Sequence, residues 1–118
     1  MSEREISLSG LRDVQAAFDV DNFSGADTPE GKRRHVFLHL GKLLGKAAGV
    51  EEQADHGNLD TTILKTDVIP DLLVFAAQLA ELEDVDLQEV FVDRLKWVAE
   101  RNGTGEQSAL DAIDGISS

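Results

Sequence analysis

The sequence predicts an all-α protein of one domain, and three observations support this prediction. Apolar residues recur at helical spacing in four separate segments of the chain. No segment shows the alternation of apolar and polar residues that is typical of a half-buried strand. The 118 residues, 42% of them hydrophobic, leave room for one modest core. We expect a helical domain over residues 1–103 and a flexible tail over residues 104–118, where small and polar residues prevail.

The first helix is predicted over about residues 8–20. One helical face carries Leu8, Leu11, Val14, Gln15 and Phe18, so it is apolar except for Gln15. The residues that follow, up to the next helix, are rich in turn formers and predict a loop.

The second helix is predicted to begin at Thr28 and to end at Gly49. Threonine is a good N-cap, and Pro29 would occupy the first helical position, where its missing N–H costs nothing. Glycine is common just after a helix ends. Residues 50–66 combine acids with a Gly-Asn pair and predict at most a helical turn followed by a loop. The apolar stripe of this helix consists of Val36, Leu40, Leu43, Leu44 and Ala47.

The third helix is expected to be the most buried part of the fold. Asp67 can cap it, Pro70 would lie in its first turn, and nearly every residue over 72–80 is apolar. A helix that is apolar almost all round in so small a domain suggests a neighbouring subunit on its far side. The fourth helix is predicted to begin with Asp86 as its cap and to end at the Asn-Gly pair of residues 102–103.

Charge and composition limit the partners that the protein can have. The net charge is −12, from 23 acidic and 11 basic residues, so the average field repels nucleic acid and anionic membranes. The chain has no cysteine, which excludes disulfides, Cys-ligated zinc and thiol catalysis. No apolar stretch approaches the roughly 20 residues that span a bilayer. We expect a soluble cytoplasmic protein without a DNA or membrane partner.

A basic stripe on the second helix is unusual for so acidic a chain. His35, His39, Lys42 and Lys46 are spaced so that all four fall on one helical face. Two histidines four residues apart are a weak zinc signal without a third ligand, so their simplest interpretation is as polar or half-buried residues. The lysines are the candidates for function.

Two stretches of the chain resemble the MazG-like, all-α NTP pyrophosphohydrolase superfamily. Residues 36–47, V-F-L-H-L-G-K-L-L-G-K-A, are similar to the signature of its second helix, and residues 68–95 are similar to its third and fourth helices. The resemblance runs from about Leu11 to Arg101. It implies a four-helix bundle, and the apolar third helix would leave a face of this bundle uncovered unless the protein is oligomeric. Members of the superfamily typically bind Mg²⁺ through E-E-x-x-E and a later E-x-x-D, and cut nucleoside triphosphates between the α- and β-phosphates.

This chain departs from the motif of the family at the metal-binding positions. In the register set by Gly45, the three carboxylates of the second helix fall on Lys42, Leu43 and Lys46. The later pair falls on Val68 and Asp71, so only Asp71 remains as a metal ligand. Ammonium groups supply positive charge where Mg²⁺ requires oxygen ligands. The resemblance thus implies that the lysines point toward Asp71, and either pair with it or bind a phosphate without metal.

A second register preserves more acids. Glu51, Glu52 and Asp55 spell E-E-x-x-D and are followed by Asp71 at a spacing that the family permits. In this register the protein would be an active Mg²⁺-dependent pyrophosphohydrolase. Against it, the glycines that flank these acids indicate a short segment rather than a long helix.

Other candidate residues lie on the fourth helix. Arg94 and Arg101 match positions where the family often carries basic residues for the substrate phosphates. Pairing with Asp93, Glu100 or neighbouring acids is the alternative interpretation. Trp97 is interpreted as packing at a subunit contact, with stacking on a base as its alternative.

Together these observations lead to three hypotheses. We favour a MazG-like protein that has lost metal-dependent catalysis, needs no cofactor, and serves as a nucleotide- or phosphate-binding or structural oligomer, either dimer or tetramer. Its phosphate-binding candidates are Lys42, Lys46, Arg94, Arg101 and His39. The alternatives are the active Mg²⁺ enzyme and a helical protein-interaction module.

Overall fold

The computed structural model describes residues 5–22, 28–102 and 111–112. Within these residues the protein consists of helices and contains no strand, so the all-α prediction is confirmed. The elements are α1 (Leu8–Asn22), α2 (Pro29–Asp55), the π-helical turn η1 (Leu64–Val68), α3 (Ile69–Glu83) and α4 (Leu87–Asn102). The predicted tail, residues 104–118, lies outside the described residues except for two positions. No helix in the described ranges is both long and apolar enough to cross a bilayer.

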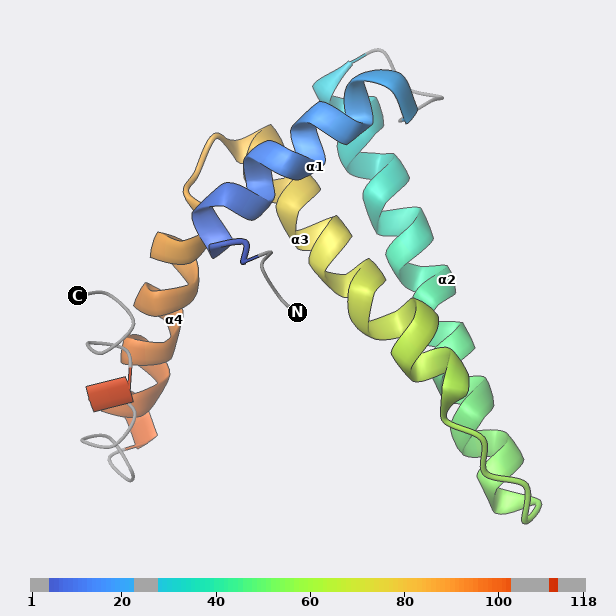
Figure 1. Cartoon of the computed structure of the whole chain (residues 1–118). Helices are drawn as coiled ribbons and strands as arrows, with labels where there is room; N and C mark the ends of the chain where they lie inside the picture. Colours follow the sequence, from blue (N-terminus) through green and yellow to red (C-terminus); the bar gives the residue numbers. More distant parts are fainter. Residues whose placement is uncertain (1–4, 23–27, 103–110, 113–118) are drawn as a thin grey trace.

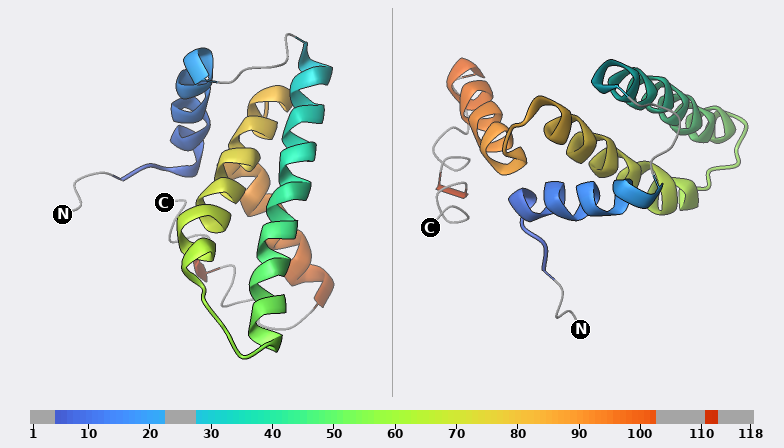
Figure 2. Two further views of the ribbon diagram at one scale, coloured as in Figure 1. Left: turned by 90° about the vertical axis from the view of Figure 1, so that its right-hand side faces the viewer. Right: turned by 90° about the horizontal axis from the view of Figure 1, so that it is seen from above.

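Helix α3 is the centre of the arrangement. It contacts α1, α2 and α4, while α2 and α4 make no contact with each other in the described part of the chain (Figures 1 and 2). Helices α2 and α3 form a long antiparallel pair, and α4 diverges from α3 after the connecting turn (Figure 1). The radius of gyration is 17.1 Å, whereas a compact domain of this length would have about 13.5 Å. The single chain is therefore open rather than closely packed.

The buried core is small and aliphatic. Among the described residues, its hydrophobic members are Val36, Leu43, Val50, Ala77, Ala80 and Ala99. Three larger residues of α3 stay 45–58% exposed, namely Ile69, Leu72 and Leu73. The central helix is thus covered by α1, α2 and α4 on part of its surface only.

The inner face of α2 follows a regular spacing of four and three residues. Val36, Leu43 and Val50 are buried, and Leu40 and Ala47 between them are half-buried. Leu44, which the apolar pattern assigns to this stripe, is 61% exposed because it lies away from the inner face of the helix. The stripe therefore matches the prediction at four of its five residues and is wrong at Leu44.

The predicted end of α2 at Gly49 is wrong. The helix continues to Asp55 and is terminated at Gly57, whose φ of 79° is in the left-handed region. A glycine inside a helix costs roughly 1 kcal/mol relative to alanine. Val50, which follows directly, is buried against the rest of the fold, and this burial continues the inner face of α2. Tertiary contact thus outweighs the local signal.

The predicted start of the third helix is also wrong. Helical structure begins at Thr62, whose backbone N–H donates to Oδ1 of Asp60 at 3.0 Å, so Asp60 and not Asp67 provides the cap. The helix then passes through η1 before continuing as α3. Pro70 lies at the beginning of α3. Because proline removes one backbone donor and crowds the preceding turn, a wide π-turn directly before it accommodates the ring.

The other two helix starts are confirmed. Oγ1 of Thr28 accepts a hydrogen bond from the N–H of Gly31 at 3.0 Å. Asp86 Oδ1 accepts from the N–H groups of Gln88 and Glu89 at 2.9 and 3.1 Å, and Ser9 of α1 donates its hydroxyl to the same carboxylate. Asp86 therefore caps α4 and also ties α1 to it. These hydrogen bonds, first of all the one from Glu89, lower the pKa of Asp86.

Helix α1 begins at Leu8, as predicted, and ends at Asn22, two residues beyond the predicted end. Its predicted apolar face is only partly used. Val14 and Phe18 are 52% and 58% exposed, whereas Gln15 is 9% exposed. Gln15 donates to Asp19, which also accepts from Gln78 of α3. The contact between α1 and α3 therefore includes a polar network, and Gln15, the polar residue of the predicted face, is part of it.

Candidate functional site

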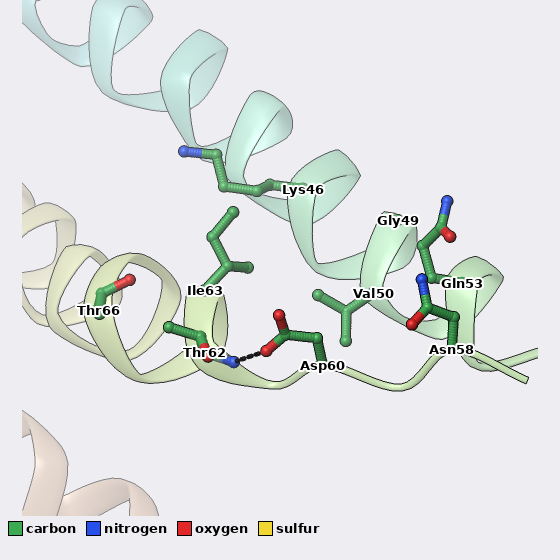
Figure 3. A pocket seen from close by; sticks show the side chains of 9 residues that line it. All are labelled: Lys46, Gly49, Val50, Gln53, Asn58, Asp60, Thr62, Ile63 and Thr66. Carbon is green, nitrogen blue, oxygen red and sulfur yellow. Dashed lines mark hydrogen bonds between the residues drawn. The ribbon is translucent and has the colours of Figure 1, made fainter.

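A groove lies between the C-terminal half of α2 and the start of the next helix (Figure 3). Its volume of about 510 Å³ is that of a site for a small organic molecule. Val50 and Ile63 form an apolar wall, and most of the polar groups are uncharged amides and hydroxyls. The lining residues are Lys46, Gly49, Val50, Gln53, Asn58, Asp60, Thr62, Ile63 and Thr66.

Lys46 places a positive charge at one end of the groove (Figure 3). Its Nζ is 3.2 Å from Oδ2 of Asp67, and both side chains are partly exposed. The hydroxyl of Thr66 donates to the other oxygen of Asp67 at 2.6 Å. The Thr66 hydrogen bond, and after it the Lys46 ammonium, lower the pKa of Asp67. The carboxylate therefore stays ionised and holds Lys46 across the α2/η1 contact.

The sequence predicts Asp71 as the partner of Lys46, but the observed partner lies one helical turn earlier in the chain. Lys46 pairs with Asp67 of η1 and not with Asp71, which is half-buried in the first turn of α3. The reason is the early start of the third helix, which brings Asp67 onto a helical turn instead of leaving it in a loop. Lys42 lies exposed one turn before Lys46, outside the lining of the groove.

The basic stripe predicted on α2 is present in the structure. The rings of His35 and His39 lie with their centroids 4.2 Å apart. Desolvation, and then the nearby charges of His35 and Lys42, lower the pKa of His39. His39 is therefore disposed to remain neutral near pH 7, so it would be a hydrogen-bonding group rather than a fixed positive charge.

The structure does not gather the acids of the second register into a cluster. Glu51, Glu52 and Asp55 are exposed near the end of α2, and Asp71 lies in α3. Within residues 5–22, 28–102 and 111–112, no group of three or more His, Asp or Glu side chains is placed to hold a metal ion.

Arg94 and Arg101 flank Trp97 on α4. Their guanidinium carbons lie 4.5 and 5.2 Å from the centre of the indole ring, within the range of a cation–π contact. Among the described residues, the ion pairs do not include one between either arginine and Asp93 or Glu100. Because α4 does not contact α2 in the described part of the chain, one chain does not bring these arginines to the Lys46 groove.

Several residues of the groove escape prediction from the sequence. Gln53, Asn58, Asp60 and Thr62 belong to the segment that the sequence predicts as largely loop. The available signal is Asp60 followed by two threonines, which can cap a helix before the Leu-rich segment. Comparison of the chain with protein-family models, curated proteins and solved structures finds no match.

The Lys46–Asp67 pair gives a testable pH dependence. A carboxylate whose pKa is lowered by folding stabilises the native state above its unfolded pKa of about 3.9, and this stabilisation is lost as pH falls through the folded pKa. We expect Thr66→Val to raise the pKa of Asp67 most, and Lys46→Met to raise it less. Both variants should lose less stability on acidification than the wild type.

The measurement is an NMR titration of the Asp67 carboxyl carbon, with thermal melts at several pH values. Lys42→Met is the matched control, because it removes a lysine one turn away that does not pair with Asp67. If both Thr66→Val and Lys46→Met leave the titration of Asp67 unchanged, the contacts of Asp67 with Thr66 and Lys46 are contradicted.

Proposed function

We propose that the protein is a MazG-like homo-oligomer that binds a nucleotide or another small phosphate-bearing ligand in the groove beside Lys46, and that metal-dependent hydrolysis is not its function. The observation that carries the proposal is the position of Lys46. Its ammonium group lies on the α2 side of the α2/α3 pair, where the resemblance places a metal-binding carboxylate, and it already engages an acid. A phosphate would replace Asp67 as the acceptor for the same ammonium group.

The remaining groove residues suit the uncharged part of such a ligand. The amides of Gln53 and Asn58 can each donate and accept hydrogen bonds, as the base or the sugar of a nucleotide requires. Val50 and Ile63 offer apolar contact. Asp60 in the lining, and the net charge of −12, disfavour a highly charged ligand. We therefore expect a nucleoside monophosphate to bind more tightly than the triphosphate.

The exposed apolar surface supports the oligomer. Val90, Phe91 and Leu95 of α4 are 37–48% exposed. Ile69, Leu72 and Leu73 of α3 are also exposed, and exposed apolar side chains that form a patch mark interaction sites. In the oligomer a neighbouring copy would cover these residues, and the closed four-helix bundle implied by the resemblance would form between subunits.

The test is a thermal-shift series on the full chain with a nucleoside, its monophosphate, its triphosphate and inorganic phosphate, each with EDTA and with Mg²⁺. We expect the monophosphate to raise the melting temperature without Mg²⁺. Lys46→Met should abolish the shift, and Lys42→Met should keep it. Thr62→Val should weaken it, because the groove then loses one hydroxyl.

Two outcomes would replace the proposal. Release of pyrophosphate from a triphosphate with Mg²⁺, abolished by Glu52→Gln, would favour the pyrophosphohydrolase that uses Glu51, Glu52, Asp55 and Asp71. The absence of any shift with every ligand would favour the helical protein-interaction module.

A further inference from the structure

We propose that two copies of this chain pair through the outer face of α2, with the two α2 helices antiparallel. The outer face consists of Phe37, Leu38, Gly41, Leu44, Gly45 and Ala48. The two-fold axis would pass between Gly41 and Gly45 of each chain. This interface is separate from the apolar surface of α3 and α4, so it adds a second contact to the oligomer proposed above, and it does not depend on the ligand.

The outer face of α2 is apolar and uncovered. Among the described elements, α2 contacts only α3 and η1. The buried residues Val36, Leu43 and Val50 mark the side of α2 that packs, and α3 runs alongside α2 (Figure 1). On the opposite side, Phe37, Leu38 and Leu44 are 53%, 61% and 61% exposed. A helix that is apolar on two opposite sides requires two packing partners, and the described part of this chain supplies one of them.

The ends of the outer face are complementary in charge. Arg34 lies on this side of α2 toward its N-terminus, and Glu52 lies on it toward the C-terminus, eighteen residues later. Arg33 adds positive charge at the N-terminal end, and Glu51 and Asp55 add negative charge at the C-terminal end. In an antiparallel pair each Arg34 comes opposite Glu52 of the partner subunit. A parallel pair would bring like charges together.

The same register also matches large side chains with small ones. With Arg34 opposite Glu52 of the partner subunit, Leu38 comes level with the partner's Ala48, and Gly41 comes level with the partner's Gly45. Phe37 lies next to the same Ala48. A Cβ atom added at Gly41 or Gly45 would meet no other atom within 4 Å, so the backbone there is open to close approach. The charges and the side-chain sizes thus favour the same antiparallel register. A second copy of this chain carries the matching charges and small residues because its outer face is identical.

Cysteine cross-linking tests the register directly, because the natural chain has no cysteine. We expect the double variant Arg34→Cys/Glu52→Cys to form a disulfide-linked dimer on mild oxidation. The two positions on one α2 are separated by about 27 Å, and a disulfide requires Cα atoms within about 7 Å. The bridge therefore cannot form within one chain. Arg34→Cys alone and Glu52→Cys alone should remain uncross-linked.

A charge exchange provides a second measurement on the same interface. Arg34→Glu and Glu52→Arg should each raise the dimer dissociation constant by about tenfold in sedimentation experiments, since each replaces two ion pairs by two like-charge contacts. The double exchange Arg34→Glu/Glu52→Arg should restore wild-type association. Gly45→Gln should block close approach while circular dichroism shows that helix content is kept. Lys42→Gln, on the basic stripe at the side of α2, is the matched control and should change nothing.

The possible failures are distinguishable. If the single-cysteine variants cross-link as efficiently as the double variant, the antiparallel register is wrong. If the wild type sediments as an oligomer but the double variant does not cross-link, the oligomer stands and this interface does not. If the wild type sediments as a monomer, this interface and the proposed oligomer both fail, and the ligand test of the Lys46 groove is unaffected.

Discussion

Replacing Arg12 by alanine should lower the melting temperature more than removing any other charged side chain of the described residues. Arg12 lies on α1 and makes three hydrogen bonds to the end of α3 and the turn that follows it. Its Nε donates to Glu81 at 2.9 Å, one terminal nitrogen donates to Asp84 at 2.9 Å, and the other donates to the carbonyl of Val85 at 2.7 Å. Without Arg12, α1 loses these three hydrogen bonds and keeps the one from Ser9 to Asp86.

The turn itself increases the expected effect. Asp84 ends α3 with a φ of 54°, in the left-handed region that costs a non-glycine residue energy. The guanidinium group binds the carboxylate of Asp84 and the next carbonyl, so it stabilises this conformation directly. We also expect Asp84→Gly to be tolerated better than Arg12→Ala, because glycine accepts the positive φ without strain.

Two further variants separate the contributions of the apolar stem, the charge and the hydrogen-bond donors of Arg12. Arg12→Met keeps much of the apolar stem and loses every donor, whereas Arg12→Lys keeps the charge with a single ammonium group in place of the planar fork. We expect the melting temperature to fall in the order wild type, Arg12→Lys, Arg12→Met, Arg12→Ala. A melting curve of Arg12→Ala equal to that of the wild type would show that α1 does not depend on this anchor.

The sequence predicts well those features that a few neighbouring residues determine. Thr28 and Asp86 cap α2 and α4 as expected, since the cap and its donors lie within three residues of each other. The inner stripe of α2 also follows from local spacing. Each of these features depends on backbone geometry that the residue types alone impose.

Features that depend on contacts between helices are predicted poorly. Gly49 is a reasonable local stop, but burial of Val50 against the rest of the fold extends α2 beyond it. Asp67 is a reasonable local cap, but Asp60 already caps the helix at Thr62, and this leaves Asp67 free to pair with Lys46. Where α2 ends and which aspartate caps the third helix depend on tertiary contacts, so neighbouring residues alone do not predict them.

In the candidate site, too, local features are predicted and features that depend on contacts between helices are not. The basic stripe on α2 can be predicted from spacing alone, and Lys46 does face the neighbouring helix. The uncharged half of the groove cannot be predicted, because Asn58 and Thr62 reach it only through the path of the connecting segment. The separation between Lys46 and the arginines of α4 depends on the divergence of α4 from α3, which is also a tertiary property.

The second large effect is expected where α2 meets α3, at Val36 and Ala77. Both side chains are fully buried. Counting from the Lys46–Asp67 pair along the antiparallel helices, ten residues on each helix lead to Val36 and Ala77. This count brings the two residues level on the helix pair, so we expect the small Ala77 to leave the space that Val36 occupies. We expect Val36→Ala to lower the free energy of unfolding by roughly 2–3 kcal/mol through lost burial and a residual cavity.

The reciprocal substitution tests whether the two residues share that space. Ala77→Val alone should overpack the contact and cost about 1–3 kcal/mol. The double variant Val36→Ala/Ala77→Val restores the total volume, so it should be more stable than the sum of the single effects predicts, with a coupling of at least about 0.5 kcal/mol. Chemical denaturation at constant protein concentration measures all four free energies. Strict additivity would mean that Val36 and Ala77 are buried by different neighbours, and that the antiparallel register of α2 and α3 differs from the one set by Lys46 and Asp67.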